Sequence, residues 1–248
     1  MDLRQRFRET ASEKGLPDAA IEWWLRLARP RLELSRAADG PVAGRFGGRP
    51  ALPEGVEWPR GTAFLATVDL AAIPPGSHDL DLPGDGHLLF FAEPEIVPED
   101  CRVVHVPAGV PVAERDVPED MYAPVYDPFP LHGRAAWSLP VERSEAAVDL
   151  GERVHDEELI ADVVVELGFD DDFQLAIGGY ADESTSGVGN PVDSPDKETL
   201  LAQLYLTDDL VGQDFGGSPL CLVSFVMSYP DLAAGRFDQA RFFSDFNG

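Results

Sequence analysis

The sequence predicts an α+β protein that is rich in β-strands and forms a single body built from two similar halves. Three observations lead to this prediction. Apolar runs of strand length recur along the 248 residues, separated by loops rich in proline, glycine and aspartate. Helical periodicity is confined to the N-terminal segment and to one later segment. Strands and helices do not alternate, which favours α+β over a parallel arrangement of βαβ units.

The N-terminal segment, residues 1–30, is predicted to be helical. Pro17 and Asp18 are residues that the first turn of a helix favours, and Ile21 and Trp24 lie on one face of the helix that follows. The alternating stretch "RLELS" then predicts a short strand over residues 31–35.

Three apolar runs in the first half predict strands. "AFLATVDL" and "GHLLFFAE" have the length and composition of buried core strands, and "CRVVHVP" continues the pattern. Residues 107–140 contain so many prolines that only short strands and loops are expected there, one of them in "RAAWSLPVE".

A change of period predicts a helix near residues 155–167. Leu159, Ile160, Val163 and Leu167 recur at helical spacing, with acidic residues before them and Gly168 after them. Further strands are predicted in "FQLAIGGY", "TLLAQLYL", "PLCLVSFVM" and "ARFFSDF".

An internal sequence similarity relates the two halves of the chain. "FLATV" at residues 64–68 matches "LLAQL" at residues 200–204, and "LLFF" ending at Phe91 matches "LVSF" ending at Phe225. The pair Gly47-Gly48 has a counterpart in Gly178-Gly179. The three features recur in the same order at similar separations, which predicts a pseudo-repeat with halves over about residues 41–106 and 155–248. We expect both halves to pack into one domain that spans residues 1–248, because their apolar runs are too short for two independent cores.

The chain is strongly acidic. Its 45 acidic and 19 basic residues give a formal net charge of −26. Such a field repels phosphate groups, so we expect binding neither to nucleic acid nor to an anionic membrane surface. Two explanations of the acidity stay open: the first is solubility, or an acidic proteome of the source organism, and the second is attraction of a basic partner protein.

Cysteine content and hydropathy favour a cytoplasmic protein. Cys101 and Cys221, the only cysteines, each adjoin an apolar run and are expected to be buried thiols. The charged N-terminal residues precede no apolar segment of the kind found in a secretory signal, and no run approaches the roughly 20 apolar residues that span a bilayer.

The sequence lacks the linear motifs of common catalytic and cofactor sites. It contains no nucleophile elbow, phosphate-binding loop, dinucleotide fingerprint, HExxH or paired CxxC. The five histidines do not have ligand spacing, so neither a metal nor a cofactor is expected. Whether the chain is an enzyme stays open, since many active sites have no linear motif.

The stretch at residues 44–70 places glycines and prolines side by side before a predicted core strand. One interpretation is a rigid loop that leads into the strand, with Trp58 as an apolar anchor on the sheet. The other is one wall of a cleft between the halves, where backbone N–H groups and a fixed cation face an opposing polar edge and bind a small polar or anionic ligand. The candidate ligand-binding residues are Gly47, Gly48, Arg49, Trp58, Tyr180 and Asp182.

Several of these stretches carry a resemblance to a known family. "GRFGGRPALPEGVEWP", "FLATVDLAAIP" and "LPGDGHLLFFAE" resemble successive signatures of the YwqG family of bacterial proteins, also described as DUF1963. "IGGYADE" and "LLAQLYLTDD" are similar to its later motifs, although Ala181 stands where the family has a proline. The resemblance covers about residues 41–247. It implies a cytosolic bacterial protein and, because some members are encoded near secreted toxins, an immunity role.

Two classes of function follow. The first is a non-catalytic binding or immunity-type protein whose acidic surface engages a basic partner such as a toxin. The second is a small-molecule-binding protein or enzyme that uses a cleft between the halves. The lack of catalytic motifs favours the first class.

Overall fold

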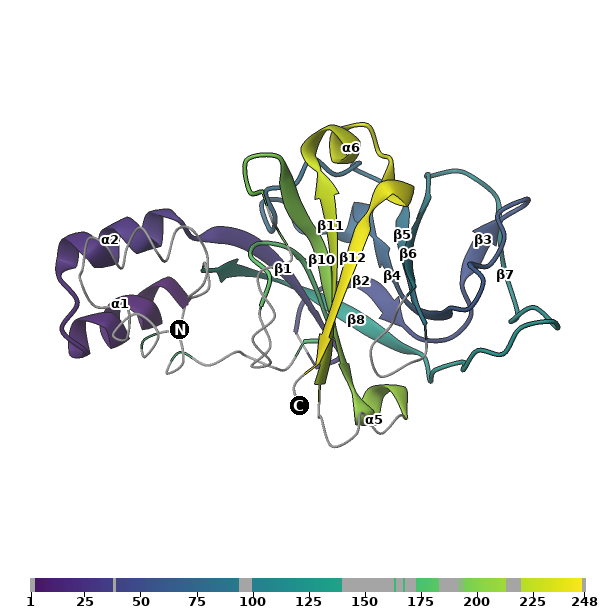
Figure 1. Ribbon diagram of the computed structural model, residues 1–248, viewed down its shortest axis with the longest axis horizontal. Helices are drawn as coiled ribbons and strands as arrows, with labels where there is room; N and C mark the ends of the chain where they lie inside the picture. The colour runs from purple at the N-terminus through teal and green to yellow at the C-terminus, as the bar shows by residue number, and fades with distance from the viewer. Residues whose placement is uncertain are drawn as a thin grey trace.

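The structure is a computed structural model that describes residues 3–37, 39–93, 100–139, 163, 167, 173–182, 192, 194–212 and 220–246. Its named helices are α1 (Leu3–Glu13), α2 (Asp18–Arg26), α5 (Asp208–Val211) and α6 (Tyr229–Ala233), with 3-10 turns η1 (Leu70–Ala72) and η2 (Phe237–Gln239). Its strands are β1 (Arg29–Ser35), β2 (Val42–Phe46), β3 (Ala51–Pro53), β4 (Ala63–Asp69), β5 (His87–Ala92), β6 (Cys101–Val106), β7 (Val112–Glu114), β8 (Phe129–Ser138), β9 (Leu175–Gly178), β10 (Glu198–Thr207), β11 (Leu220–Ser228) and β12 (Arg241–Phe246). The described chain is therefore rich in β-strands and has few helices, as the sequence predicts (Figure 1).

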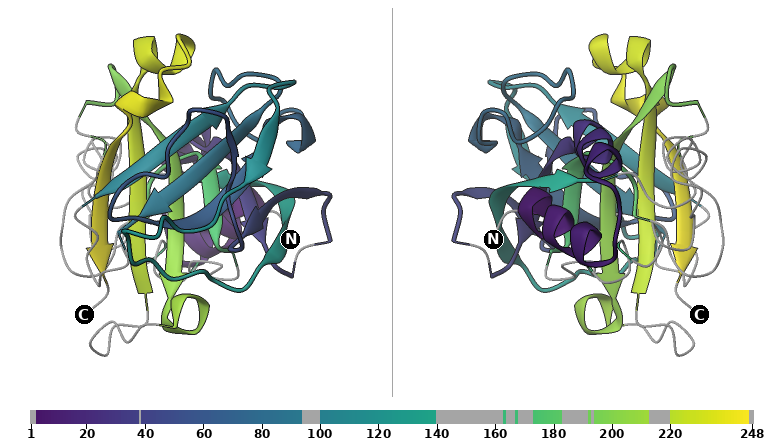
Figure 2. Two further views of the ribbon diagram at one scale, coloured as in Figure 1. Left: turned by 90° about the vertical axis from the view of Figure 1, so that its right-hand side faces the viewer. Right: turned by 90° about the vertical axis from the view of Figure 1, so that its left-hand side faces the viewer.

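Ten strands form one antiparallel sheet in the order β12-β11-β10-β9-β1-β8-β2-β4-β5-β6. The sheet curls strongly. Phe90 in β5 and Phe225 in β11 are separated by six strands in this order, yet their ring centroids lie 5.3 Å apart. The sheet, whose curl Figure 2 shows, consequently encloses one main hydrophobic core on its inner face, with residues from both ends of the sheet.

The two end units of the sheet have the same strand arrangement. β2-β4-β5-β6 forms one end and β9-β10-β11-β12 the other, with β1 and β8 between them. In β4 the pairing shifts between Phe64 and Ala66, and in β10 it shifts between Leu200 and Ala202. Each unit also contains a pair of glycines whose φ is positive, between 64° and 77°. Gly47 and Gly48 follow β2, and Gly178 and Gly179 lie at the end of β9.

The helices α1 and α2 form a separate apolar cluster at the end of the molecule opposite β3 and β7 (Figure 1). The rings of Phe7 and Trp24 stack there with their centroids 5.8 Å apart. Val163 and Leu167 are helical and buried in the same cluster. They are the only positions of the helix predicted at residues 155–167 that belong to the described residues.

The centre of the sheet differs from the prediction. Residues 107–140 were expected to hold only short strands, yet β8 has ten residues and lies between β1 and β2. Its proline, Pro130, lies beyond His132, where the pairing with β1 ends, so at this position β8 has a partner strand on one side only and resembles an edge strand. The predicted helical segment 1–30 also extends too far, because α2 ends at Arg26 and β1 begins at Arg29.

Candidate functional site

The first candidate site lies in the β3–β7 lobe, which we define as residues 49–62 and 107–127. The chain leaves the sheet at two glycines to reach it. The Gly47 N–H donates to the Leu65 carbonyl at 2.7 Å, and the Gly48 N–H donates to the Tyr126 carbonyl at 2.9 Å. These two donors are thus engaged by the protein itself. A Cβ at Gly47 would lie 2.7 Å from two backbone oxygens, so this turn requires glycine.

Trp58 attaches the lobe to the outer face of the sheet. Its indole N–H donates to the Thr62 carbonyl at 2.8 Å, and its ring meets Phe91 edge-on at 5.7 Å between centroids. With Phe64 and Leu89 these rings form a buried cluster outside the main core. Trp58 therefore contributes a firmly held apolar surface to the lobe.

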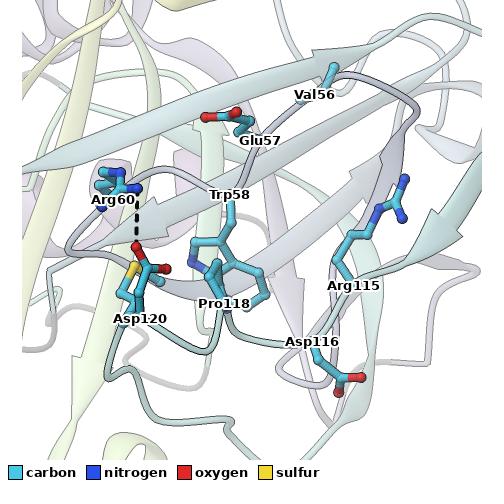
Figure 3. A pocket seen from close by; sticks show the side chains of 9 residues that line it. Val56, Glu57, Trp58, Arg60, Arg115, Asp116, Pro118 and Asp120 are labelled. Carbon is cyan, nitrogen blue, oxygen red and sulfur yellow. Dashed lines mark ion pairs between the residues drawn. The ribbon is translucent and has the colours of Figure 1, made fainter.

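A pocket of about 330 Å³ opens beside Trp58. Its lining mixes apolar and charged side chains: Val56, Glu57, Trp58, Arg60, Arg115, Asp116, Pro118, Asp120 and Met121. Figure 3 shows Trp58 in the middle of these residues, with Arg115 and Asp116 on one side and Arg60 and Asp120 on the other. The lining comes from two segments of the lobe that are about 60 residues apart in sequence.

The charged groups around the pocket are partly paired. Arg60 forms an ion pair with Asp120 at 3.2 Å, and Arg49 donates to Asp116. All four side chains are more than half exposed. Among the described residues, the side chains of Glu57 and Arg115 have no hydrogen-bond or ionic partner. They remain available to an incoming ligand.

The lobe also gathers exposed apolar side chains. Of the seven large apolar residues that are exposed in the described chain, five belong to it: Val56, Val110, Val112, Tyr122 and Val125. Tyr122 is 90% exposed and follows Met121 of the pocket lining. Because the lobe holds most of the exposed large apolar residues of the described chain, it is the part of the described surface where an interaction site is most expected.

A second candidate site, the Arg31 cluster, is buried on the outer face of β1, β9 and β10. The Arg31 guanidinium donates to Asp182 at 2.9 Å and to Glu33 at 3.0 Å. Tyr205 donates its hydroxyl to Asp182. Gln203 bonds the backbone of Asp182 twice, at 2.7 and 2.8 Å. The cluster thus joins β1 and β10 to the segment that follows β9.

The electrostatics of the Arg31 cluster favour a structural role for its side chains over a catalytic one. Burial lowers the pKa of Arg31, but Asp182, Tyr205 and Glu33 outweigh it, and the pKa is raised overall. Burial and the adjacent Asp182 carboxylate raise the pKa of Tyr205 well above its ordinary value. With Arg134, which donates to Glu33 at 2.6 Å, two cations balance two carboxylates. A protonated tyrosine and a balanced ion network contain no activated base or nucleophile.

The structure places the predicted site residues in two separate groups. Gly47, Gly48, Arg49 and Trp58 belong to the lobe or its entrance. Tyr180 donates its hydroxyl to the Leu27 carbonyl at 2.8 Å, and Asp182 belongs to the Arg31 cluster. Within the described residues, no hydrogen bond, ion pair or ring contact joins the two groups. That they share a ligand stays a prediction.

Sequence reasoning missed several residues of both sites. In the Arg31 cluster these are Arg31, Glu33, Gln203 and Tyr205, although their alternation with leucine in "RLELS" and "AQLYL" places them on one face of each strand. In the pocket they are Val56, Glu57 and Arg60, which lie next to the predicted Trp58, and the lining residues of 115–121, a loop without any periodic pattern.

Replacement of Arg49 by alanine is expected to change the free energy of unfolding by no more than about 1 kcal/mol, because its ion pair with Asp116 is exposed and screened by water. Urea unfolding measures this change. Arg60→Ala, which removes the other exposed pair, is the matched control. A loss of several kcal/mol would contradict this view of Arg49. If a small ligand binds through Arg49, the variant should also lose the rise in Tm that the ligand gives the wild type.

The described residues contain no group of three or more histidine, cysteine, aspartate or glutamate side chains arranged to hold a metal ion. In the same part of the chain, no helix is long and apolar enough to cross a membrane.

Fold and sites together define the class of this chain. It is a β-rich protein with a curled antiparallel sheet, a buried cluster of ion pairs and a lobe that exposes both apolar and charged side chains. A model of the family described as "Domain of unknown function (DUF1963)" matches residues 44–245, and the chain belongs to this family. The match runs from β2 to β12, so it includes the lobe and Asp182 but not Arg31. No curated protein matches the chain.

Proposed function

We propose that this chain is a non-catalytic binding protein that engages a protein partner through the β3–β7 lobe. The observation that carries the proposal is the exposed ring of Tyr122 beside a pocket that is fixed to the sheet by Trp58. Tyrosine is among the residues most often found as anchors of protein interfaces. The two buried acids of the Arg31 cluster are already neutralised, which supports a binding role over a catalytic one.

Charge indicates the kind of partner. The lobe contains seven acidic and three basic residues, and the whole chain has a formal net charge of −26. Such a surface attracts a basic protein over a long range and repels acidic ones. A basic toxin neutralised by this chain is the partner that the family resemblance suggests, and an immunity role is part of the proposal.

Small-molecule binding by the pocket is the second candidate function. A volume of about 330 Å³ lies at the lower end of the range that binds small ligands. A ligand that fills the pocket should raise the Tm of the wild type without any dependence on Tyr122, and this separates the two candidates.

We also propose that the two end units are halves of a pseudo-repeat. Three features support this: the common strand arrangement, the glycine pairs, and the pairing shifts at Phe64/Ala66 and Leu200/Ala202. Ala66 pairs with Phe90 in the first unit, and the equivalent Ala202 pairs with Phe225 in the second. The position equivalent to Phe225 is therefore Phe90, one residue before the Phe91 that the sequence comparison suggests. An experimental structure whose two units do not superpose would contradict this proposal.

Replacement of Tyr122 by serine is expected to weaken partner binding by at least tenfold, the effect of losing an interface anchor of about 1.4 kcal/mol or more. Proteins captured by the wild type are identified by mass spectrometry, and the Kd of each purified candidate is measured by calorimetry. Tyr229→Ser removes an exposed tyrosine outside the lobe, in α6, and is the matched control. The proposal fails if both variants bind the partner as tightly as the wild type, or if Tyr229→Ser weakens binding as much as Tyr122→Ser.

A further inference from the structure

We infer that the Trp58 pocket receives a single basic side chain, lysine or arginine, from the partner, and that its charge pairs with Glu57. This inference rests on the proposed function and names the chemistry of the group bound. It follows from the lining of the pocket, from the state of its charged residues and from the charge of the lobe.

The apolar part of the lining fits the stem of a long side chain. Carbon and sulfur surface comes from Val56, Trp58, Pro118 and Met121. One hydrogen bond of the indole and the packing of its ring hold Trp58 in place. Lysine and arginine bury their methylene groups along such surface while their charged ends stay near water. The pocket is also large enough for one such side chain, at about 330 Å³.

The charged part of the lining favours a cation. Three acids and two arginines surround the pocket. Asp120 is paired with Arg60, and Asp116 with Arg49, whereas Glu57 has no partner among the described residues. A cation that enters the pocket gains Glu57 as a partner, whereas the other two carboxylates already have arginine partners.

Arg115 presents the opposite possibility, since its side chain also has no partner within the described chain. Because Asp116 and Asp120 are already paired with arginines, Glu57 and Arg115 are the two unpaired charges of the lining, one of each sign. The field of a chain with net charge −26 repels an anion from Arg115 and attracts a cation to Glu57. The net charge of the chain therefore selects a basic side chain over an acidic one.

The test uses small probes and the full chain. Nα-acetyl-arginine amide and Nα-acetyl-lysine amide are titrated into labelled protein, and the indole N–H signal of Trp58 is followed by NMR. The chain has four tryptophans, so the Trp58 signal is assigned as the one missing from Trp58→Phe. The expected result is a saturable shift with a Kd on the order of millimolar, the strength of one weak contact. Nα-acetyl-glutamate amide and uncharged Nα-acetyl-norleucine amide should bind at least about tenfold more weakly.

Glu57→Gln should weaken the binding of the arginine probe by about tenfold, the effect of removing one charge-assisted contact. Glu54→Gln is the matched control, because Glu54 is an exposed acid of the same lobe that does not line the pocket. The inference is overturned if the glutamate or norleucine probe binds as tightly as the arginine probe. It is also overturned if Glu57→Gln has no effect, or if no basic probe gives a saturable shift.

Measuring how tightly the two variants bind the partner distinguishes this inference from the proposed function. If Tyr122→Ser weakens partner binding and Glu57→Gln does not, the lobe is the interface but the pocket receives no basic side chain. If neither variant weakens partner binding while the arginine probe still depends on Glu57, the pocket binds cations and the proposed function is wrong.

Discussion

Replacement of Arg31 by methionine is expected to lower the free energy of unfolding by about 3–5 kcal/mol, the usual cost of removing one member of a buried ion pair. Arg31 is only 7% exposed, and its guanidinium contacts the carboxylates of both Glu33 and Asp182. Methionine fills a similar space but leaves both acids buried without this cation. Equilibrium unfolding in urea, followed by fluorescence and circular dichroism, measures the change.

Arg134→Met is the matched control for this prediction. Arg134 contacts the same Glu33, but its side chain is 51% exposed. Water screens this interaction, so we expect its loss to cost about 1 kcal/mol or less. Equal losses for the two variants would show that the buried position of Arg31 is not the source of its effect.

Replacement of Gly47 by alanine is expected to cost more than about 3 kcal/mol, because it combines two penalties. The backbone has φ of +64°, which side chains other than hydrogen disfavour, and the added Cβ would lie 2.7 Å from the carbonyl oxygens of Tyr126 and Asp127. Neither oxygen can move without displacing backbone. Thermal unfolding measures the loss of stability.

Gly55→Ala isolates the first of these penalties. Gly55 also has a positive φ, of +80°, but no atom lies within 4 Å of the position that a Cβ would take. Its replacement should cost only about 1–2 kcal/mol. If Gly47→Ala proves as mild as Gly55→Ala, the turn into the lobe is more adaptable than the packing indicates.

The apolar runs of the sequence predict the inner strands well because those strands are buried on both faces. Most residues of β4, β5 and β10 are buried, so apolar side chains dominate both faces of these strands and the signal does not depend on register. β8 is different. It carries a proline, a histidine and an arginine among its first six residues, and it forms a long central strand only because β1 and β2 pair with its two sides. Such pairing is a tertiary effect that local propensity does not contain.

The sites illustrate a similar limit. Alternation in "RLELS" places Arg31 and Glu33 on one face of β1, but it does not reveal that this face is covered. Asp182, which neutralises Arg31, follows 151 residues later in the chain. In the lobe, Trp58 could be predicted as an anchor from its neighbours, whereas the opposite wall of the pocket is a loop whose position depends on the packing of β3 and β7.

The central position of β1 has a consequence for the order in which the protein can fold during synthesis. β1 precedes the other described strands in the chain, but both of its neighbours come much later: Leu32 pairs with Ala135 in β8 and with Ile177 in β9. Until residue 178 has left the ribosome, this strand cannot complete its hydrogen bonds on both edges. Pairings between such distant residues are slow to form. The nascent chain therefore keeps Leu32 and Leu34 of β1 without partner strands on both edges until β8 and β9 have been made, a period in which a chaperone would protect them from aggregation.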